Sequence, residues 1–170
     1  MFDSTADLSA SMTTEAAFNR LSIAMHDFER AIAFAEEAQK YRADLLAHEA
    51  LVFAAIVSYY RLFSSNEKDE NALAAKQVKL EDFKPLTCEE LSLHEKCKEL
   101  RNQALAHSAF KYNPTRLDRS PGGIVSRPFS LLSHAPDLTS LVVLARKLAD
   151  ECHHKRADYV REEASTRFHR

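Results

Sequence analysis

Apolar residues recur at intervals of three and four through most of this 170-residue chain, and this spacing restricts its fold more than any other feature. The interval matches one face of an α-helix, so an all-α fold is expected. The first apolar stripe comprises Phe18, Leu21, Met25, Phe28, Ile32 and Ala35. Thr13 or Thr14 can cap this helix, and Glu15 adds favourable charge in its first turn. A first helix is therefore predicted from there to about Gln39.

The next two helices differ in character. A second helix is predicted from about Ala43 to Phe63, and its middle is apolar nearly all round, which is typical of a bundle centre or a subunit interface. Residues 64–86 are polar and predict a connection with a short helical turn. Thr87 and Glu90 form a T-x-x-E capping box, so a third helix is predicted from Thr87 to about Ser108.

A long insertion separates the third helix from the last one. Asn113-Pro114 indicates a break, since the residue before proline avoids helical geometry. Residues 115–133 predict an irregular segment or a short hairpin around Pro121-Gly122-Gly123. Asp137 or Thr139 then begins a final helix with a strongly charged far end. The prediction is a four-to-five-helix up-and-down bundle with this insertion before its last helix.

Composition excludes several classes of site. The two glycines, Gly122 and Gly123, cannot supply a GxGxxG or GxxxxGK[ST] phosphate loop. Three cysteines form no CxxC pair, and the adjacent residues Cys152, His153 and His154 point in different directions on a helix and make a poor chelate. We therefore expect reduced thiols, no metal site and no cofactor.

Localisation and domain boundaries are inferred from the ends of the chain and from its longest apolar run. The N-terminus is polar and acidic, so no signal peptide is expected, and the run at 50–60 is too short to span a membrane. A cytoplasmic protein without membrane association is predicted. Residues 13–165 are expected to form one helical domain, with a flexible segment at 1–12 and a frayed tail at 166–170.

Charge is distributed unevenly. Residues 64–95 hold four lysines against eight acids, for a net −4, whereas residues 96–127 hold seven basic residues against two acids, for a net +5. A local basic segment can bind phosphate even in a slightly acidic protein, although chance clustering on a solvated face is the simpler interpretation.

The basic segment contains the run ELRNQALAHSAF at 99–110. On a helical wheel, one stripe comprises Leu93, Cys97, Leu100, Ala104 and His107. His107 would thus end a buried face, which is also the usual place for a packed structural histidine. Arg101 lies at its margin, about 120° from His107 in a regular helix. The two side chains would meet poorly within one chain, but two copies facing across a two-fold axis could bring them together.

The pattern R-N-x-x-x-x-H, formed here by Arg101, Asn102 and His107, resembles the signature of the HEPN superfamily, and its abortive-infection branch in particular. The ending YYRLFSS of the second helix and the continuation LAHSAF strengthen the resemblance, which would cover residues 14–165. It implies a helical bundle that dimerises through its motif helices and often acts as a metal-independent RNase. Some toxins of the family carry a tyrosine two residues after the histidine, where this chain has Ala109, so regulation through such a tyrosine is not expected.

The residue types suit that chemistry. Histidine can serve as acid or base near neutral pH, arginine makes a fixed bidentate phosphate contact, and asparagine can orient a phosphate or hold the histidine ring. Arg101, Asn102 and His107 are therefore the candidate catalytic residues. The candidate RNA-binding residues are Arg61, Lys111, Tyr112, Arg116 and Arg119. Arg61 has a second interpretation, as a favourable charge at the end of its helix.

Three functions fit the sequence. The first is a homodimeric RNase that acts as the toxin of a toxin–antitoxin or phage-defence system, with RNA and a cognate antitoxin protein as partners. The second is a non-catalytic dimeric module of HEPN type that binds a nucleotide, RNA or a partner protein. The third is a helical bundle that matches the pattern by chance.

Overall fold

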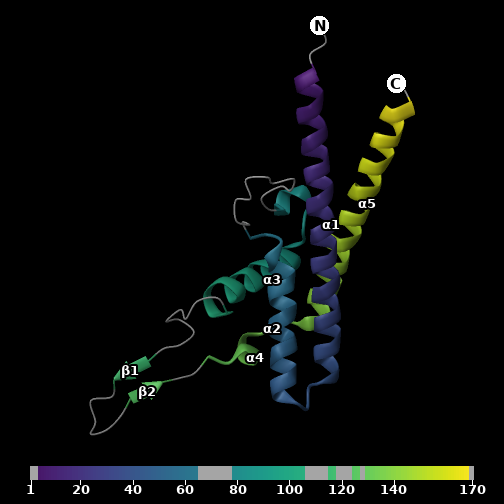
Figure 1. Cartoon of the computed structure of the whole chain (residues 1–170). Coiled ribbons are helices and arrows are strands. Elements are labelled where there is room, and N and C mark those ends of the chain that lie inside the picture. Colours follow the sequence, from purple (N-terminus) through teal and green to yellow (C-terminus); the bar gives the residue numbers. More distant parts are fainter. Residues whose placement is uncertain (1–3, 65–77, 106–114, 118–123, 127–128, 169–170) are drawn as a thin grey trace.

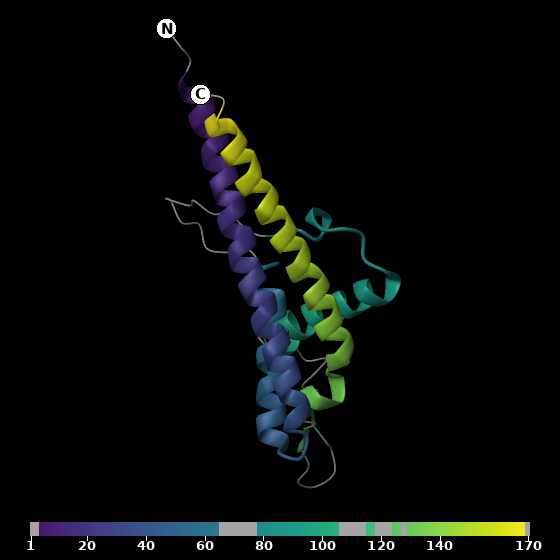
Figure 2. The same cartoon turned by 90° about the vertical axis from the view of Figure 1, so that its right-hand side faces the viewer.

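The computed structural model describes residues 4–64, 78–105, 115–117, 124–126 and 129–168. The fold is an all-α bundle that carries a small two-stranded hairpin, as predicted. Its two longest helices, α1 (Ser4–Lys40) and α5 (Leu138–Phe168), run side by side, and α2 (Leu45–Arg61) packs along α1 (Figures 1 and 2). The shorter α3 (Cys88–Glu99) crosses next to α2 and α5.

The predicted helix starts are confirmed where a side-chain cap defines them. Asp44 Oδ1 accepts a hydrogen bond from Ala47 N at 3.1 Å at the start of α2. The Thr87–Glu90 capping box is present, with Glu90 N donating to Thr87 Oγ1 at 3.2 Å and Thr87 N donating to Glu90 Oε2 at 2.8 Å. Asp137, rather than Thr139, caps α5, because its Oδ1 accepts from Ser140 N at 2.7 Å.

The first helix begins earlier than predicted. It starts at Ser4 instead of Thr13 or Thr14, so most of the polar segment that was expected to be flexible is helical. Its buried face is also shifted from the predicted stripe towards smaller residues. The buried apolar positions on α1 are Leu21, Ala24, Phe28, Ala31, Ala35 and Ala38. Four alanines on this face let α2 and α5 approach α1 closely.

An aromatic cluster joins three helices and the segment before α3. The Phe28 ring on α1 lies 5.9 Å from the Tyr59 ring on α2 and 6.2 Å from the Phe83 ring, centroid to centroid. Phe63 lies 4.7 Å from the His94 ring of α3 in an edge-on arrangement. Phe83 follows the 3₁₀ turn η1 (Leu80–Asp82), so the short helical turn predicted in the 64–86 connection is confirmed.

The third helix changes its geometry at Leu100. It is α-helical to Glu99 and continues as a π-helical segment, η2 (Leu100–Leu105), where an uninterrupted helix to about Ser108 was predicted. Residues 106–108 lie outside the described residues.

The insertion holds the predicted hairpin. Strands β1 (Thr115–Leu117) and β2 (Ile124–Ser126) pair antiparallel, with Arg116 opposite Val125. The Pro121-Gly122-Gly123 turn lies outside the described residues. A single helical turn that the sequence did not predict, α4 (Leu131–His134), leads from the hairpin to α5. In the described part of the chain, no helix is long and apolar enough to cross a membrane.

Candidate functional site

Arg101 and Asn102 form the described part of the predicted site. Both side chains are half-buried at the start of η2, and Arg101 Nη1 donates a hydrogen bond to Asn102 Oδ1 at 2.8 Å. The residues just before them anchor this end of the helix, because Cys97 is fully buried and Leu100 nearly so. Arg101 therefore follows a buried part of the helix, and the amide oxygen of Asn102 orients its guanidinium.

The π-helical segment departs from the regular helix on which the predicted relation between Arg101 and His107 was based. The wheel that separated them by about 120° assumed a regular α-helix through both residues. A π-helix bonds residue i to residue i+5 and shifts everything that follows it to another face. His107 lies outside the described residues, so its distance from Arg101 stays a prediction.

Two cations of this helix act on Tyr60 of α2. Burial raises the pKa of the Tyr60 hydroxyl, while the positive charges of Lys98 and Arg101 act in the opposite direction. Lys98 Nζ also pairs with Glu95 Oε2 at 2.9 Å, and both side chains are about half exposed. Two cations therefore lie near the end of α2, and one of them is paired with Glu95.

Arg61 is engaged elsewhere. Its Nε donates to Asp27 Oδ2 at 3.0 Å, and its Nη2 pairs with Asp27 Oδ1. Asp27 on α1 is buried, and the nearby Arg20 donates to the carbonyl of Leu62 after the last turn of α2. These contacts favour the structural interpretation of Arg61 over a place beside Arg101.

The other predicted RNA-binding residues are only partly located. Arg116 lies on β1, with its side chain outside the described residues. Lys111, Tyr112 and Arg119 lie outside the described residues altogether, as does His107. The structure therefore brings Arg101 and Asn102 together and leaves the arrangement of the rest as a prediction.

Cysteines and histidines do not assemble into a ligand set in the described part of the chain, where no group of three potential metal ligands occurs. Cys97 and Cys152 are buried, and burial raises the pKa of each thiol to about 12. His154 Nδ1 lies 2.6 Å from the Asp150 carbonyl oxygen one turn before it.

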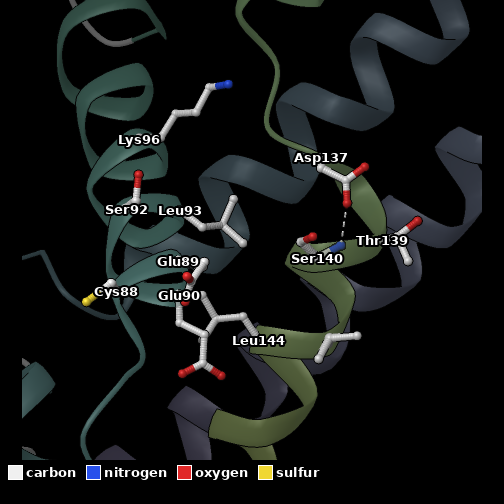
Figure 3. A pocket seen from close by; sticks show the side chains of 11 residues that line it. Cys88, Glu89, Glu90, Ser92, Leu93, Lys96, Asp137, Thr139, Ser140 and Leu144 are labelled. Atoms are coloured by element: carbon white, nitrogen blue, oxygen red, sulfur yellow. Dashed lines mark hydrogen bonds between the residues drawn. The ribbon is translucent and has the colours of Figure 1, made fainter.

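A groove of about 670 Å³ between α3 and the start of α5 was not predicted (Figure 3). Lys147 Nζ pairs with Glu90 Oε2 at 2.7 Å on one side of it, and Lys96 Nζ donates to the Ala135 carbonyl at 3.0 Å. Its lining residues are Cys88, Glu89, Glu90, Ser92, Leu93, Lys96, Asp137, Thr139, Ser140, Val143 and Leu144. No local sequence signal could have revealed it, because it depends on how two helices far apart in the chain are placed.

Comparison of the chain with models of known protein families found no match, and comparisons with curated proteins and with solved structures found none either. The resemblance to the HEPN superfamily therefore rests on the residue pattern and on its position in a helical bundle.

Proposed function

We propose that this chain is a metal-independent endoribonuclease that acts as a homodimer and serves as the toxin of a toxin–antitoxin or phage-defence system. The observation that supports this most directly is the hydrogen-bonded Arg101–Asn102 pair at the start of a π-helical segment. Short π-helical turns inside helices occur frequently at functional sites, where they turn side chains away from the regular helical face.

The arginine suits a phosphate contact. Its guanidinium has five N–H donors in a planar fork, and the bond to Asn102 uses one of them. A guanidinium held in this way loses less freedom when it binds a phosphate, and its charge stabilises the negative charge that develops during cleavage. Asn102 therefore acts as a positioning residue and Arg101 as the phosphate-binding catalytic residue.

His107 supplies proton transfer in this proposal. Cleavage without a metal requires a base for the 2′-hydroxyl and an acid for the leaving oxygen, and histidine can serve as either near neutral pH. One chain offers one such histidine at the motif, whereas a dimer offers two. Lys111, Tyr112, Arg116 and Arg119 would contact the RNA backbone and bases around it. Arg61 is left out of this set because Asp27 holds its guanidinium.

A non-catalytic module that binds RNA or a nucleotide is the second candidate. The Arg101–Asn102 bond favours it as much as the first, because a positioned arginine is enough to bind a phosphate. The two functions differ only in whether His107 transfers protons.

Cleavage assays on purified protein test the proposal. Single-stranded RNA should be cut in the presence of EDTA, the products should end in a 2′,3′-cyclic phosphate, and DNA, which lacks the attacking hydroxyl, should stay intact. Replacing Arg101 or His107 by alanine should each lower the cleavage rate by about 10²–10³ or more, with a smaller effect for Asn102→Ala. Arg30→Ala, an exposed arginine on α1, is the matched control and should cut at the normal rate.

Cleavage that needs Mg²⁺, or that persists after His107→Ala, would contradict the ribonuclease assignment. RNA binding that is lost in Arg101→Ala without any cleavage by the parent protein would favour the binding module.

A further inference from the structure

Tyr60, in the last turn of α2, has a buried ring and a hydroxyl that reaches the surface. The residue is 7% exposed, and its ring lies 5.7 Å from the Phe63 ring and 5.5 Å from the His94 ring, centroid to centroid. Its hydroxyl makes no hydrogen bond to the described residues, yet it is not one of the buried polar atoms that lack a partner. The Tyr60 oxygen is therefore open to solvent at the edge of the aromatic cluster.

The preceding residue, Tyr59, differs in this respect. It is fully buried, and its hydroxyl lies 3.1 Å from His94 Nδ1. Of these two adjacent tyrosines, one thus has its hydroxyl bound inside the core, while the other presents its hydroxyl to solvent. A phenol whose ring is already fixed by packing can donate a hydrogen bond to a ligand at little cost in conformational entropy.

The face of α3 that meets Tyr60 continues into the candidate site. His94 and Lys98 lie within about 40° of each other on a helical wheel, and Arg101 follows one turn after Lys98 on the same side. Helix α2 contacts both α3 and η2, so its last turn lies along this face. Burial raises the pKa of the Tyr60 hydroxyl, and the charges of Lys98 and Arg101 lower it, as expected for a phenol that lies near both cations.

Arg101 is the better placed of these two cations to bind an anion. Lys98 Nζ is paired with Glu95 Oε2 at 2.9 Å, whereas Arg101 donates to the neutral amide of Asn102. Guanidinium groups and tyrosine hydroxyls are both donors that proteins use to hold the phosphate oxygens of nucleic acids. Two such donors on neighbouring helices can bind two oxygens of the same phosphate.

We propose that Tyr60 is a further RNA-binding residue, whose hydroxyl donates a hydrogen bond to the phosphate that Arg101 holds. It takes the place at the end of α2 that Arg61, one residue later, was predicted to fill. This inference rests on the phosphate contact of Arg101 in the proposed function. It applies equally to the ribonuclease and to the binding module, because it does not involve His107.

Fluorine NMR of the ligand-free protein tests the geometry. When fluorotyrosine replaces all five tyrosines, the Tyr60 resonance is the one that disappears in Tyr60→Phe. Arg101→Ala should shift this resonance, because it removes a positive charge near the ring. The resonance of exposed Tyr41, at the other end of α2, is the control and should not move. An unmoved Tyr60 resonance would overturn the inference without bearing on the proposed function.

Binding of single-stranded 2′-O-methyl RNA, followed by fluorescence anisotropy, tests the contact without cleavage, since the attacking hydroxyl is blocked. Tyr60→Phe keeps the ring and removes the donor, so binding should weaken about tenfold, as expected when a hydrogen bond to a charged group is lost. The matched control, Tyr59→Phe, removes a hydroxyl that is held inside the core, and it should bind like the parent protein. Helical circular dichroism should be the same in all three proteins.

The outcomes separate this inference from the proposed function. Binding that is unchanged in Tyr60→Phe, or that is weakened equally in Tyr60→Phe and Tyr59→Phe, overturns the role of Tyr60 and leaves Arg101 as the phosphate-binding residue. A parent protein that does not bind RNA overturns the proposed function, and the role of Tyr60 with it.

Discussion

Acidification should destabilise the fold through His94. This residue is only 4% exposed, its Nδ1 lies 3.1 Å from the Tyr59 hydroxyl, and the rings of Tyr59, Tyr60 and Phe63 surround it. Burial lowers the pKa of the His94 imidazole, and the charge of Lys98 lowers it further, while Glu95 acts in the opposite direction. The fold therefore holds His94 neutral at a pH where the unfolded chain can protonate it.

The sign and the size of the effect follow from proton linkage. Above the pKa of an unfolded histidine, about 6.5, both states hold His94 neutral and its full contribution to stability is present. As the pH falls below that value, only the unfolded state binds the proton, so the free energy of unfolding decreases by about 1.4 kcal/mol per pH unit. The decrease continues until the pH reaches the lowered pKa of His94 in the fold.

Urea unfolding followed by circular dichroism over this pH range measures the effect. His94→Gln can still hydrogen-bond Tyr59 but cannot titrate, so its stability should decline less steeply on acidification, by about 1.4 kcal/mol per pH unit relative to the parent protein. The exposed residue His153 provides the control, and His153→Gln should keep the parent slope. An unchanged slope in His94→Gln would refute the argument that burial governs the titration of His94.

Two further predictions concern buried groups. Asp27→Asn should lower the free energy of unfolding by about 3 kcal/mol in urea titrations, because it leaves Arg61 and the buried Arg20 without their negative partner. A decrease below about 0.5 kcal/mol would contradict this role of Asp27. Among the three cysteines, only Cys88 should react with iodoacetamide in the folded protein, and mass spectrometry should find Cys97 and Cys152 modified only after unfolding. Both of these thiols are buried, and burial raises the pKa of each to about 12. Rapid modification of either buried thiol in the native state would show that its part of the core opens readily.

Local sequence signals predicted the helix starts well. Packing between helices accounts for most of the differences between the predicted and the observed structure. Capping boxes and carboxylate caps act within four residues, so Thr87 and Asp137 could be recognised from the sequence. The extension of α1 to Ser4 could not, because its N-terminal residues show no apolar periodicity. His94 was missed for a related reason: the wheel placed the buried stripe along Leu93 and Cys97, whereas the aromatic cluster draws the adjacent residue inward.

The candidate site likewise has one feature that the local sequence predicts and others that it does not. Arg101 and Asn102 are neighbours in the chain, so their association is a local property that the motif already suggested. The pairing of Arg61 with Asp27 depends on a contact between two helices, and neither this pairing nor the π-helical turn could be predicted from periodicity. Arg61 illustrates the difficulty, since the same charge at the end of a helix can face a cleft or a carboxylate on a neighbouring helix.

The pairing of α1 with α5 has a consequence for how the chain folds during synthesis. The start of α1 and the end of α5 lie at the same end of the bundle, although the rest of the fold separates them in sequence (Figure 1). At about 5–20 residues per second, a ribosome needs on the order of 5–20 s to make the roughly one hundred residues between these two helices. During that interval α1 has α2 available to cover one side, while the surface that later contacts α5 stays uncovered. Four of the buried residues of α1 are alanines, so its uncovered surface exposes less apolar area than a leucine-rich surface would. The nascent chain is therefore less prone to aggregate before α5 is made.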